Sequence, residues 1–144
     1  MRSLAKLQPY ALLLIRLVIG LSMVYHSWDK VMPSDGLRHA YYNHHLLAPE
    51  EHFNAFVASL GMPAWSGYLS TATEFIGGLF LIAGLLTRFW AFLVTINMLV
   101  AVLLVNRHHG YAGSEYSLAL IAMAFLLCTA GSGSLALDRR FGIG

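Results

Sequence analysis

Two charged side chains fall inside apolar stretches that are long enough to cross a membrane. Arg16 lies in the stretch 10–28 and Glu74 in the stretch 64–87. A charge near the bilayer centre costs about 2.5–3.5 kcal/mol on insertion scales, so such residues usually face a bundle interior and find partners there. Counted inward from the outer helix ends at about 1.5 Å per residue, both lie roughly 15–18 Å deep. We therefore predict that Arg16 and Glu74 form a buried ion pair, or are linked by water.

The pattern leaves two interpretations of this pair open. As a structural clasp it would fix the helix register, a use that buried ion pairs often have. As a functional centre it would receive a ligand headgroup or relay protons. Gly77 and Gly78 follow on the Glu74 face, where small residues either let another helix approach or leave room for a flat ring. His26 and Lys30, four residues apart, share one face at the outer end of the first helix.

The histidines gather on one side of the predicted bundle. All seven lie at or beyond its outer face, namely His26, His39, His44, His45, His52, His108 and His109. Imidazole suits zinc and copper, but no pair has the i, i+4 spacing of a preformed helical site. We therefore expect ordinary surface histidines and no metal centre. The alternative is an outer-face copper or zinc site at His44, His45, His108 and His109.

The cysteine content limits the redox chemistry that the chain can carry out alone. Cys128 is the single cysteine, so the chain cannot form an internal disulfide or exchange dithiols by itself. It also has no four-cysteine cluster site and no CxxCH haem motif. Nor is there a G-x-G-x-x-G turn or a P-loop for a nucleotide or flavin. We expect no intrinsic cofactor, so that electrons would have to come from a partner protein.

The composition indicates which elements position these residues. Of 144 residues, 58% are hydrophobic and 11% are charged, against about 25% charged in soluble domains. The chain holds four apolar stretches near the length of about 20 residues that a spanning helix needs, namely 10–28, 64–87, 89–106 and 116–137. Because lipid requires backbone polar groups to be satisfied within each segment, we predict an all-α integral membrane four-helix bundle. We expect residues 1–144 to form one domain in the lipid bilayer and to have no nucleic-acid partner.

The first loop, 29–63, is too long to be a plain connector. Pro49-Glu50-Glu51 is typical of a helix start, with proline in the first turn and acids at the positive end of the dipole. Phe53, Phe56, Val57 and Leu60 then follow at i, i+3, i+4 and i+7. This spacing predicts a short amphipathic helix on the outer rim, which either plugs the mouth of the bundle or acts as a lid.

Basic residues predict the orientation in the membrane. With four spans, the termini and the second loop share a side that carries five of them, Arg2, Lys6, Arg88, Arg139 and Arg140. The other side carries three, Lys30, Arg38 and Arg107. Because cytoplasmic loops are enriched in Lys and Arg, we expect both termini in the cytoplasm.

Several short motifs follow one another along most of the chain. They are Arg16-Leu17-Val18-Ile19-Gly20, His26, Lys30, Ala58-Ser59-Leu60-Gly61-Met62-Pro63, Glu74-Phe75-Ile76-Gly77-Gly78-Leu79, Gly84-Leu85-Leu86-Thr87-Arg88, Glu115 and Gly131-Ser132-Gly133. In this order they resemble the DoxX family of small four-helix bacterial membrane proteins, from about Leu14 to Phe141. The chain departs from the family's His-Gly at His26-Ser27, and from its Ser-Leu-Asp close at Ala136-Leu137-Asp138.

The resemblance implies a location and a role. Family members are linked to respiratory or sulfur redox complexes, including a quinone-reducing thiosulfate oxidoreductase, and to complexes that counter oxidative stress. We therefore expect a bacterial inner-membrane subunit of a redox complex, working with a redox partner protein or a second copy. The polar positions shared with the family are Arg16, His26, Lys30, Glu74, Arg88 and Glu115.

The charges within the predicted spans and the family resemblance together predict quinone binding in a polar pocket within the membrane. The residues expected around it are Arg16, Glu74, Gly77, Gly78, His26 and Lys30. One alternative is a non-catalytic membrane anchor or assembly subunit, in which the charges are only a clasp. The other is the outer-face metal handler described above.

Overall fold

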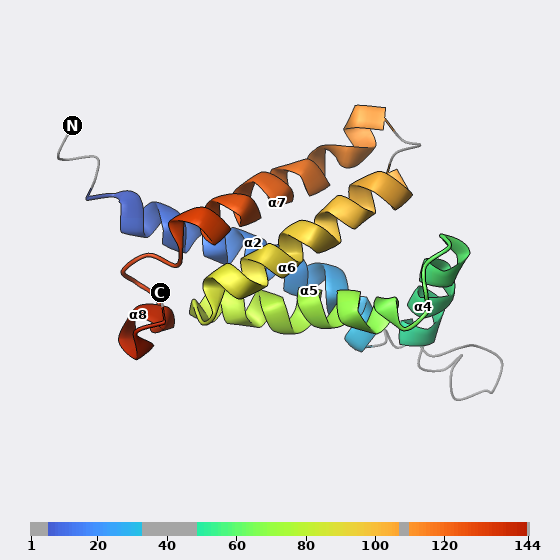
Figure 1. Ribbon diagram of the computed structural model, residues 1–144, viewed down its shortest axis with the longest axis horizontal. Coiled ribbons are helices and arrows are strands. Elements are labelled where there is room, and N and C mark those ends of the chain that lie inside the picture. The colour runs from blue at the N-terminus through green and yellow to red at the C-terminus, as the bar shows by residue number, and fades with distance from the viewer. Residues whose placement is uncertain (1–5, 33–48, 107–109, 144) are drawn as a thin grey trace.

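The computed structural model describes residues 6–32, 49–106 and 110–143, and all regular structure within them is helical. The elements in chain order are α2 (Gln8–Val31), α4 (Pro49–Ser59), α5 (Ser66–Ala83), α6 (Thr87–Val100), the π-helix η1 (Ala101–Val105), α7 (Gly110–Ala130) and α8 (Leu137–Phe141) (Figure 1). The all-α prediction is therefore confirmed.

Among the described residues, three helices are long and apolar enough to cross a membrane. They are α2, the continuous helix Thr87–Val105 formed by α6 and η1, and α7. Large apolar side chains such as Leu14, Phe92 and Phe125 are exposed on them, as lipid-facing residues are. The helix α5 is shorter and carries the polar residues Ser66, Ser70, Thr71, Thr73 and Glu74 in its first half. A fourth span over 64–87 stays a prediction.

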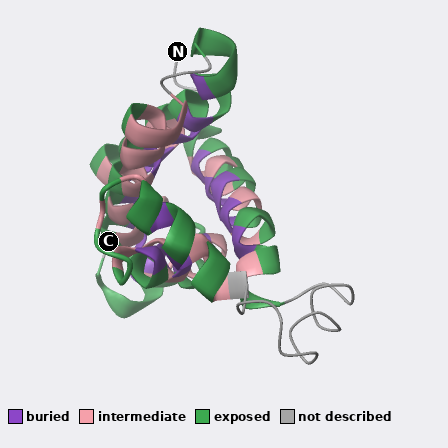
Figure 2. Ribbon diagram, turned by 90° about the vertical axis from the view of Figure 1, so that its right-hand side faces the viewer, coloured by how far each residue is buried: buried purple, intermediate pink, exposed green. Residues whose placement is uncertain are grey.

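The helices pack as two pairs that diverge. The helix α2 packs mainly on α5, and α6 packs mainly on α7. The pairs lie close at the end that carries α8 and separate toward the end that carries α4 (Figure 1). Buried positions form stripes along the helices, with fully buried Ile19, Leu81, Val94 and Leu120 in the core (Figure 2). The packed core therefore holds one end of the bundle together and leaves the other end open to a cavity.

Two glycines set the close crossing of α2 and α5. A Cβ added at Gly20 would lie 2.6 Å from the carbonyl oxygen of Gly78, and one added at Gly78 would lie 2.8 Å from that of Gly20. Real Cβ atoms do not approach that closely, so the two backbones touch where the helices cross. Small residues permit this kind of approach between membrane helices.

The predicted rim helix is confirmed as α4, with Glu50 and Glu51 in its first turn. Its inward side is anchored by Val57, which is 3% exposed, and by Asn54, which packs against Gly67 of α5. The helix contacts both α2 and α5. Hence α4 lies across the open end of the bundle.

At the other end a carboxylate caps α6. Both oxygens of Asp138 accept backbone bonds, from the amides of Leu86 at 2.6 Å and Thr87 at 2.9 Å. Leu86 has a left-handed backbone with φ of 50°, a conformation that costs a non-glycine residue roughly 1–2 kcal/mol. These two bonds satisfy helix-start amides that would otherwise lack partners, which stabilises the tight turn between α5 and α6.

Candidate functional site

A cavity of about 560 Å³ lies at the α4 end, where the two helix pairs diverge. Its walls come from the last turns of α2, from α4, from the first half of α5, from α6 and η1, and from α7. Phe53, Phe56, Leu69 and Ile96 supply much of the apolar lining. Its size and apolar character are those of ligand pockets, which span roughly 300–1,000 Å³ and use few polar groups for orientation.

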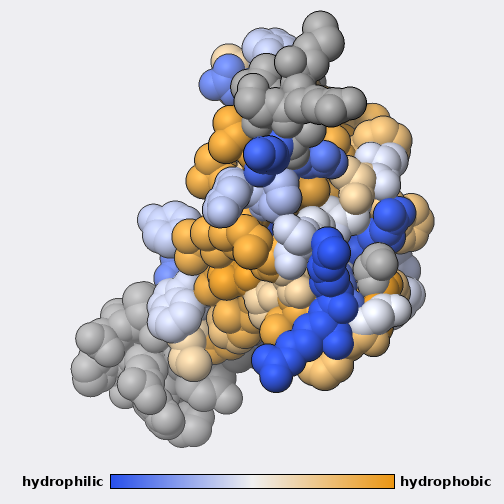
Figure 3. All heavy atoms as spheres, turned by 90° about the vertical axis from the view of Figure 1, so that its left-hand side faces the viewer, coloured by the Kyte–Doolittle hydropathy of each residue, from blue (hydrophilic) through white to orange (hydrophobic). Residues whose placement is uncertain are grey.

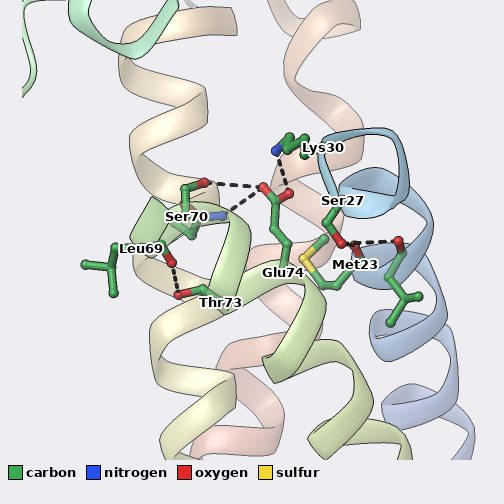
Figure 4. A network of polar contacts seen from close by, with 9 residues as sticks. Met23, Ser27, Lys30, Leu69, Ser70, Thr73 and Glu74 are labelled. Atoms are coloured by element: carbon green, nitrogen blue, oxygen red, sulfur yellow. Dashed lines mark hydrogen bonds and ion pairs between the residues drawn. The ribbon is translucent and has the colours of Figure 1, made fainter. Parts of the chain in front are cut away.

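Glu74 is the centre of the polar groups in this cavity. Its Oε2 lies 2.6 Å from Lys30 Nζ, and its Oε1 accepts bonds from Asn97 Nδ2 at 3.1 Å and from Ser70 Oγ at 3.5 Å. Figure 4 shows Lys30 at one oxygen of the carboxylate and Ser70 at the other. Ser70 stands one helical turn before Glu74, while Lys30 and Asn97 come from α2 and α6. The carboxylate therefore joins three helices.

Lys30 connects the same network to α4. Its ammonium lies 3.8 Å from the centroid of the Phe53 ring, in cation–π contact. The Lys30 side chain is 19% exposed and that of Glu74 is 7% exposed. A partly desolvated cation thus sits between a carboxylate and an aromatic ring, at the edge of an apolar cavity.

A second carboxylate, Glu50, lies beside this pair at the start of α4. Its Oε1 is buried and has no hydrogen-bond partner in the part of the chain that the structure describes. Burial raises the pKa of Glu50 above its ordinary value of 4.5. The Thr71 hydroxyl and the Lys30 charge act in the opposite direction, and the Glu74 charge adds to the increase in this pKa.

The far wall of the cavity is formed by η1 and α7. Ala101 and Val105 of the π-helix line it, and π-helical turns are rare elements that occur frequently at functional sites. Asn106 Nδ2 donates to Ser117 Oγ at 3.1 Å. The ring of His26 lies 5.1 Å from the ring of Tyr116.

The predicted pairing of Arg16 with Glu74 is wrong. Arg16 is 1% exposed and lies toward the α8 end, where Nη1 donates to the carbonyl of Ser132 and Nη2 to that of Leu135, both at 2.9 Å. The acidic group close enough to act on it electrostatically is Asp138. Arg16 therefore clasps the segment before α8, and it does not line the cavity around Glu74.

Arg16 and Glu74 do not lie at the same depth, because their helices end and begin at other residues than the sequence indicated. The helix α2 extends to Val31 and α5 begins only at Ser66. Arg16 thus lies about 22 Å from the end of its helix and Glu74 about 12 Å from the start of its own, at about 1.5 Å per residue. With the depths about 10 Å apart, Lys30 near the end of α2 is the cation within reach of Glu74.

Gly77 and Gly78 also lie outside the cavity, contrary to the prediction of a pocket around them. A Cβ at Gly77 would lie 2.7 Å from Trp90 Cε3, and Gly78 touches Gly20 as described above. Both glycines serve helix packing. Of the predicted site residues, the structure brings Glu74, Lys30 and His26 together in the cavity lining.

Several cavity residues were not among the predicted site residues. The i−4 spacing of Ser70 from Glu74 was a usable signal, whereas only the tertiary structure could place Phe53, Asn97 and Asn106 here. His44, His45, His108 and His109 lie outside the described residues. Within the described ranges, no three His, Cys, Asp or Glu side chains are grouped as metal ligands would be.

Comparisons with known proteins identify the family of this chain. The profile of the DoxX family matches residues 11–107, which includes Lys30, Glu74 and Asn97. The chain is 27% identical over 127 residues to "Putative oxidoreductase CatD" of Bacillus subtilis (strain 168), covering 88% of this chain and 83% of that protein. No solved structure matches. Because the profile covers more than half of a chain that is built of membrane helices, this protein belongs to the DoxX family.

Proposed function

We propose that this protein binds a quinone headgroup in the α4-end cavity, as the membrane subunit of a redox complex whose partner protein supplies electrons. The observation that carries the proposal is the Lys30–Glu74–Asn97 network at the edge of an apolar cavity of about 560 Å³. A quinone is a flat apolar ring with two carbonyl acceptors. It therefore matches apolar walls that meet a small set of hydrogen-bond donors. The Bacillus relative, which is named a putative oxidoreductase, is consistent with a redox role.

The polar groups have distinct roles in this proposal. The Lys30 ammonium and the Asn97 amide donate to one quinone carbonyl, while Glu74 holds both donors in place. Reduction to the quinol consumes two electrons and two protons, and both electrons come from the partner protein. In this proposal Lys30 passes one proton to the carbonyl oxygen that it hydrogen-bonds, as a general acid does, and the second proton comes from water.

Binding of a short-chain quinone to the purified protein in lipid nanodiscs, measured by titration calorimetry, tests this proposal. A hydrogen bond to a charged group contributes about 1.5–3 kcal/mol, so Lys30→Met and Glu74→Gln should weaken binding by roughly 10- to 100-fold. Glu115→Gln is the matched control, because Glu115 is exposed on α7 and does not line the cavity. It should bind as the wild type does. Equal affinity in all four proteins would overturn the proposal.

A second candidate function is a non-catalytic anchor or assembly subunit. The observation that favours it is Arg16, a buried charge that, among residues 6–32, 49–106 and 110–143, donates hydrogen bonds only to backbone carbonyls. Under this function, Arg16→Gln and Glu74→Gln each lower the amount of complex recovered with a partner protein and leave the activity per complex unchanged. Native purification followed by mass spectrometry of the co-purified proteins, with activity normalised to complex, separates the two candidates.

A further inference from the structure

A second cavity, of about 260 Å³, lies at the opposite end of the bundle. We call it the arginine–glycine pocket. Its lining consists of Arg88, Ala130, Gly131, Ser132, Gly133, Ser134 and Arg139. Figure 3 views the molecule from this end and shows a stripe of strongly hydrophilic side chains bordered by hydrophobic ones. The pocket is thus polar and basic, in contrast to the apolar cavity under α4.

The two guanidinium groups of this pocket have no acidic partner among the described residues. Arg88 Nη1 donates to the carbonyl of Cys128 at 3.2 Å. The Arg139 side chain makes no hydrogen bond or ion pair with the part of the chain that the structure describes. The neighbouring acid, Asp138, already uses both oxygens on the amides of Leu86 and Thr87. Two positive charges therefore line a cavity to which the described part of the chain contributes no compensating carboxylate.

The loop between the arginines is held in a defined shape. Gly131 and Gly133 have φ of 82° and 78°, which side-chain-bearing residues rarely adopt. A Cβ at Gly131 would lie 3.2 Å from Arg88 Nη2, so this glycine lets the guanidinium lie against the backbone. On its inner side the loop is bonded to Arg16 through the Ser132 carbonyl. The pocket is therefore built in advance of any ligand.

The position along the membrane helices determines which anion this pocket meets. Arg88 is the second residue of the candidate span Thr87–Val105, and Ala130 is the last residue of the candidate span Gly110–Ala130. The ends of spanning helices lie at the lipid headgroups, where phosphate is the abundant anion. Phe89 and Leu126 are exposed on the same two helices and offer apolar surface for acyl chains.

We propose that the arginine–glycine pocket binds the phosphate of an anionic phospholipid headgroup. Guanidinium groups hold phosphate oxygens through paired, charge-assisted hydrogen bonds, which a lysine ammonium does not reproduce. Basic pockets between membrane helices are known to recognise anionic headgroups in this way. The hydroxyl groups of Ser132 and Ser134 add donors at the same cavity.

The test measures lipid binding to detergent-purified full-length protein by native mass spectrometry, with phosphatidylglycerol, phosphatidylcholine and inorganic phosphate as separate probes. Wild type should retain phosphatidylglycerol at least tenfold more strongly than phosphatidylcholine. Arg88→Gln and Arg139→Gln should each remove most of this preference. Arg140→Gln is the matched control, because Arg140 is an exposed neighbour that does not line the pocket. It should keep most of the preference.

A conservative variant and a folding measurement separate the loss of lipid binding from the loss of the fold. Arg88→Lys retains the charge without the guanidinium fork, and we expect it to bind phosphatidylglycerol more weakly than wild type. Circular dichroism of each variant establishes that the helices remain folded. Equal retention of phosphatidylglycerol by wild type and a folded Arg88→Gln/Arg139→Gln protein would overturn the proposal. Binding of inorganic phosphate without binding of phosphatidylglycerol would also overturn it, because the pocket would then take the free anion.

Discussion

At the scale of single residues, the acids of this protein differ in what compensates their charge. Glu74 is buried but has an ammonium 2.6 Å away and an amide donor at 3.1 Å. Asp138 is buried with two backbone amides on its oxygens. Glu50 has a buried oxygen with no hydrogen-bond partner among the described residues. Burial disfavours the ionised carboxylate and raises the pKa of Glu50, although Thr71 and Lys30 act in the opposite direction.

The raised pKa of Glu50 predicts a pH-dependent contribution of this residue to the stability of the protein. Because burial raises its folded-state pKa above the ordinary value of 4.5, Glu50 contributes stability that is fully present below pH 4.5. That contribution is lost as the pH rises through the raised pKa. The melting temperature of the wild type in detergent should therefore fall relative to that of Glu50→Gln between pH 4.5 and neutrality.

The control for this measurement is Glu115→Gln, which removes an exposed acid from α7. Its melting temperature should follow that of the wild type at every pH. Lys30 on α2, with Glu74 and Thr71 on α5, are the charged and polar groups that act on Glu50. A constant difference between wild type and Glu50→Gln across this pH range would contradict the prediction.

At the scale of elements, each contact between helices uses its own device. The helices α2 and α5 meet backbone to backbone at Gly20 and Gly78. The turn between α5 and α6 is held by Asp138, the second residue of the short helix α8. The helix α4 is tied to α2 through Lys30 and Phe53. These devices leave the α4 end less densely packed, which is where the larger cavity lies.

The glycine crossing predicts a size limit at α5. Gly78→Ala places a Cβ 2.8 Å from the Gly20 carbonyl oxygen and 2.9 Å from Val24 Cγ2, so α2 and α5 must move apart. Overpacking of this kind costs about 1–3 kcal/mol, and we expect a loss of unfolding free energy in that range in a denaturant titration. Ala122→Val enlarges an exposed position of α7 and should change the unfolding free energy far less. Equal effects of the two substitutions would show that the crossing does not limit packing.

At the scale of the whole molecule, the two ends of the bundle differ in their charged residues and in the size of their cavities. The α8 end carries Arg88, Arg139 and Arg140 beside the smaller pocket, and the α4 end carries Lys30 and Glu74 at the larger one. Because positive residues are enriched on the cytoplasmic side, we expect the α8 end and both termini on the cytoplasmic side of the bacterial inner membrane. The larger cavity would then lie toward the outer face.

Cysteine labelling in intact cells tests this orientation. In a Cys128→Ser background, Glu115→Cys lies at the α4 end and Arg140→Cys at the α8 end, and both positions are exposed. A membrane-impermeant maleimide should label Glu115→Cys in intact cells and Arg140→Cys only after lysis. Labelling in the reverse pattern would place the termini outside.

The features that depend on composition and short-range periodicity could be predicted from the amino-acid sequence. Low charge and apolar stretches indicated membrane helices, the residues at i, i+3, i+4 and i+7 placed α4, and the ordered motifs indicated the family. The structure decided which charges meet. Arg16 bonds to carbonyls more than a hundred residues away, and Glu74 pairs with Lys30. Such pairing depends on where each helix begins and how helices cross, and neither can be read from the local pattern of one segment.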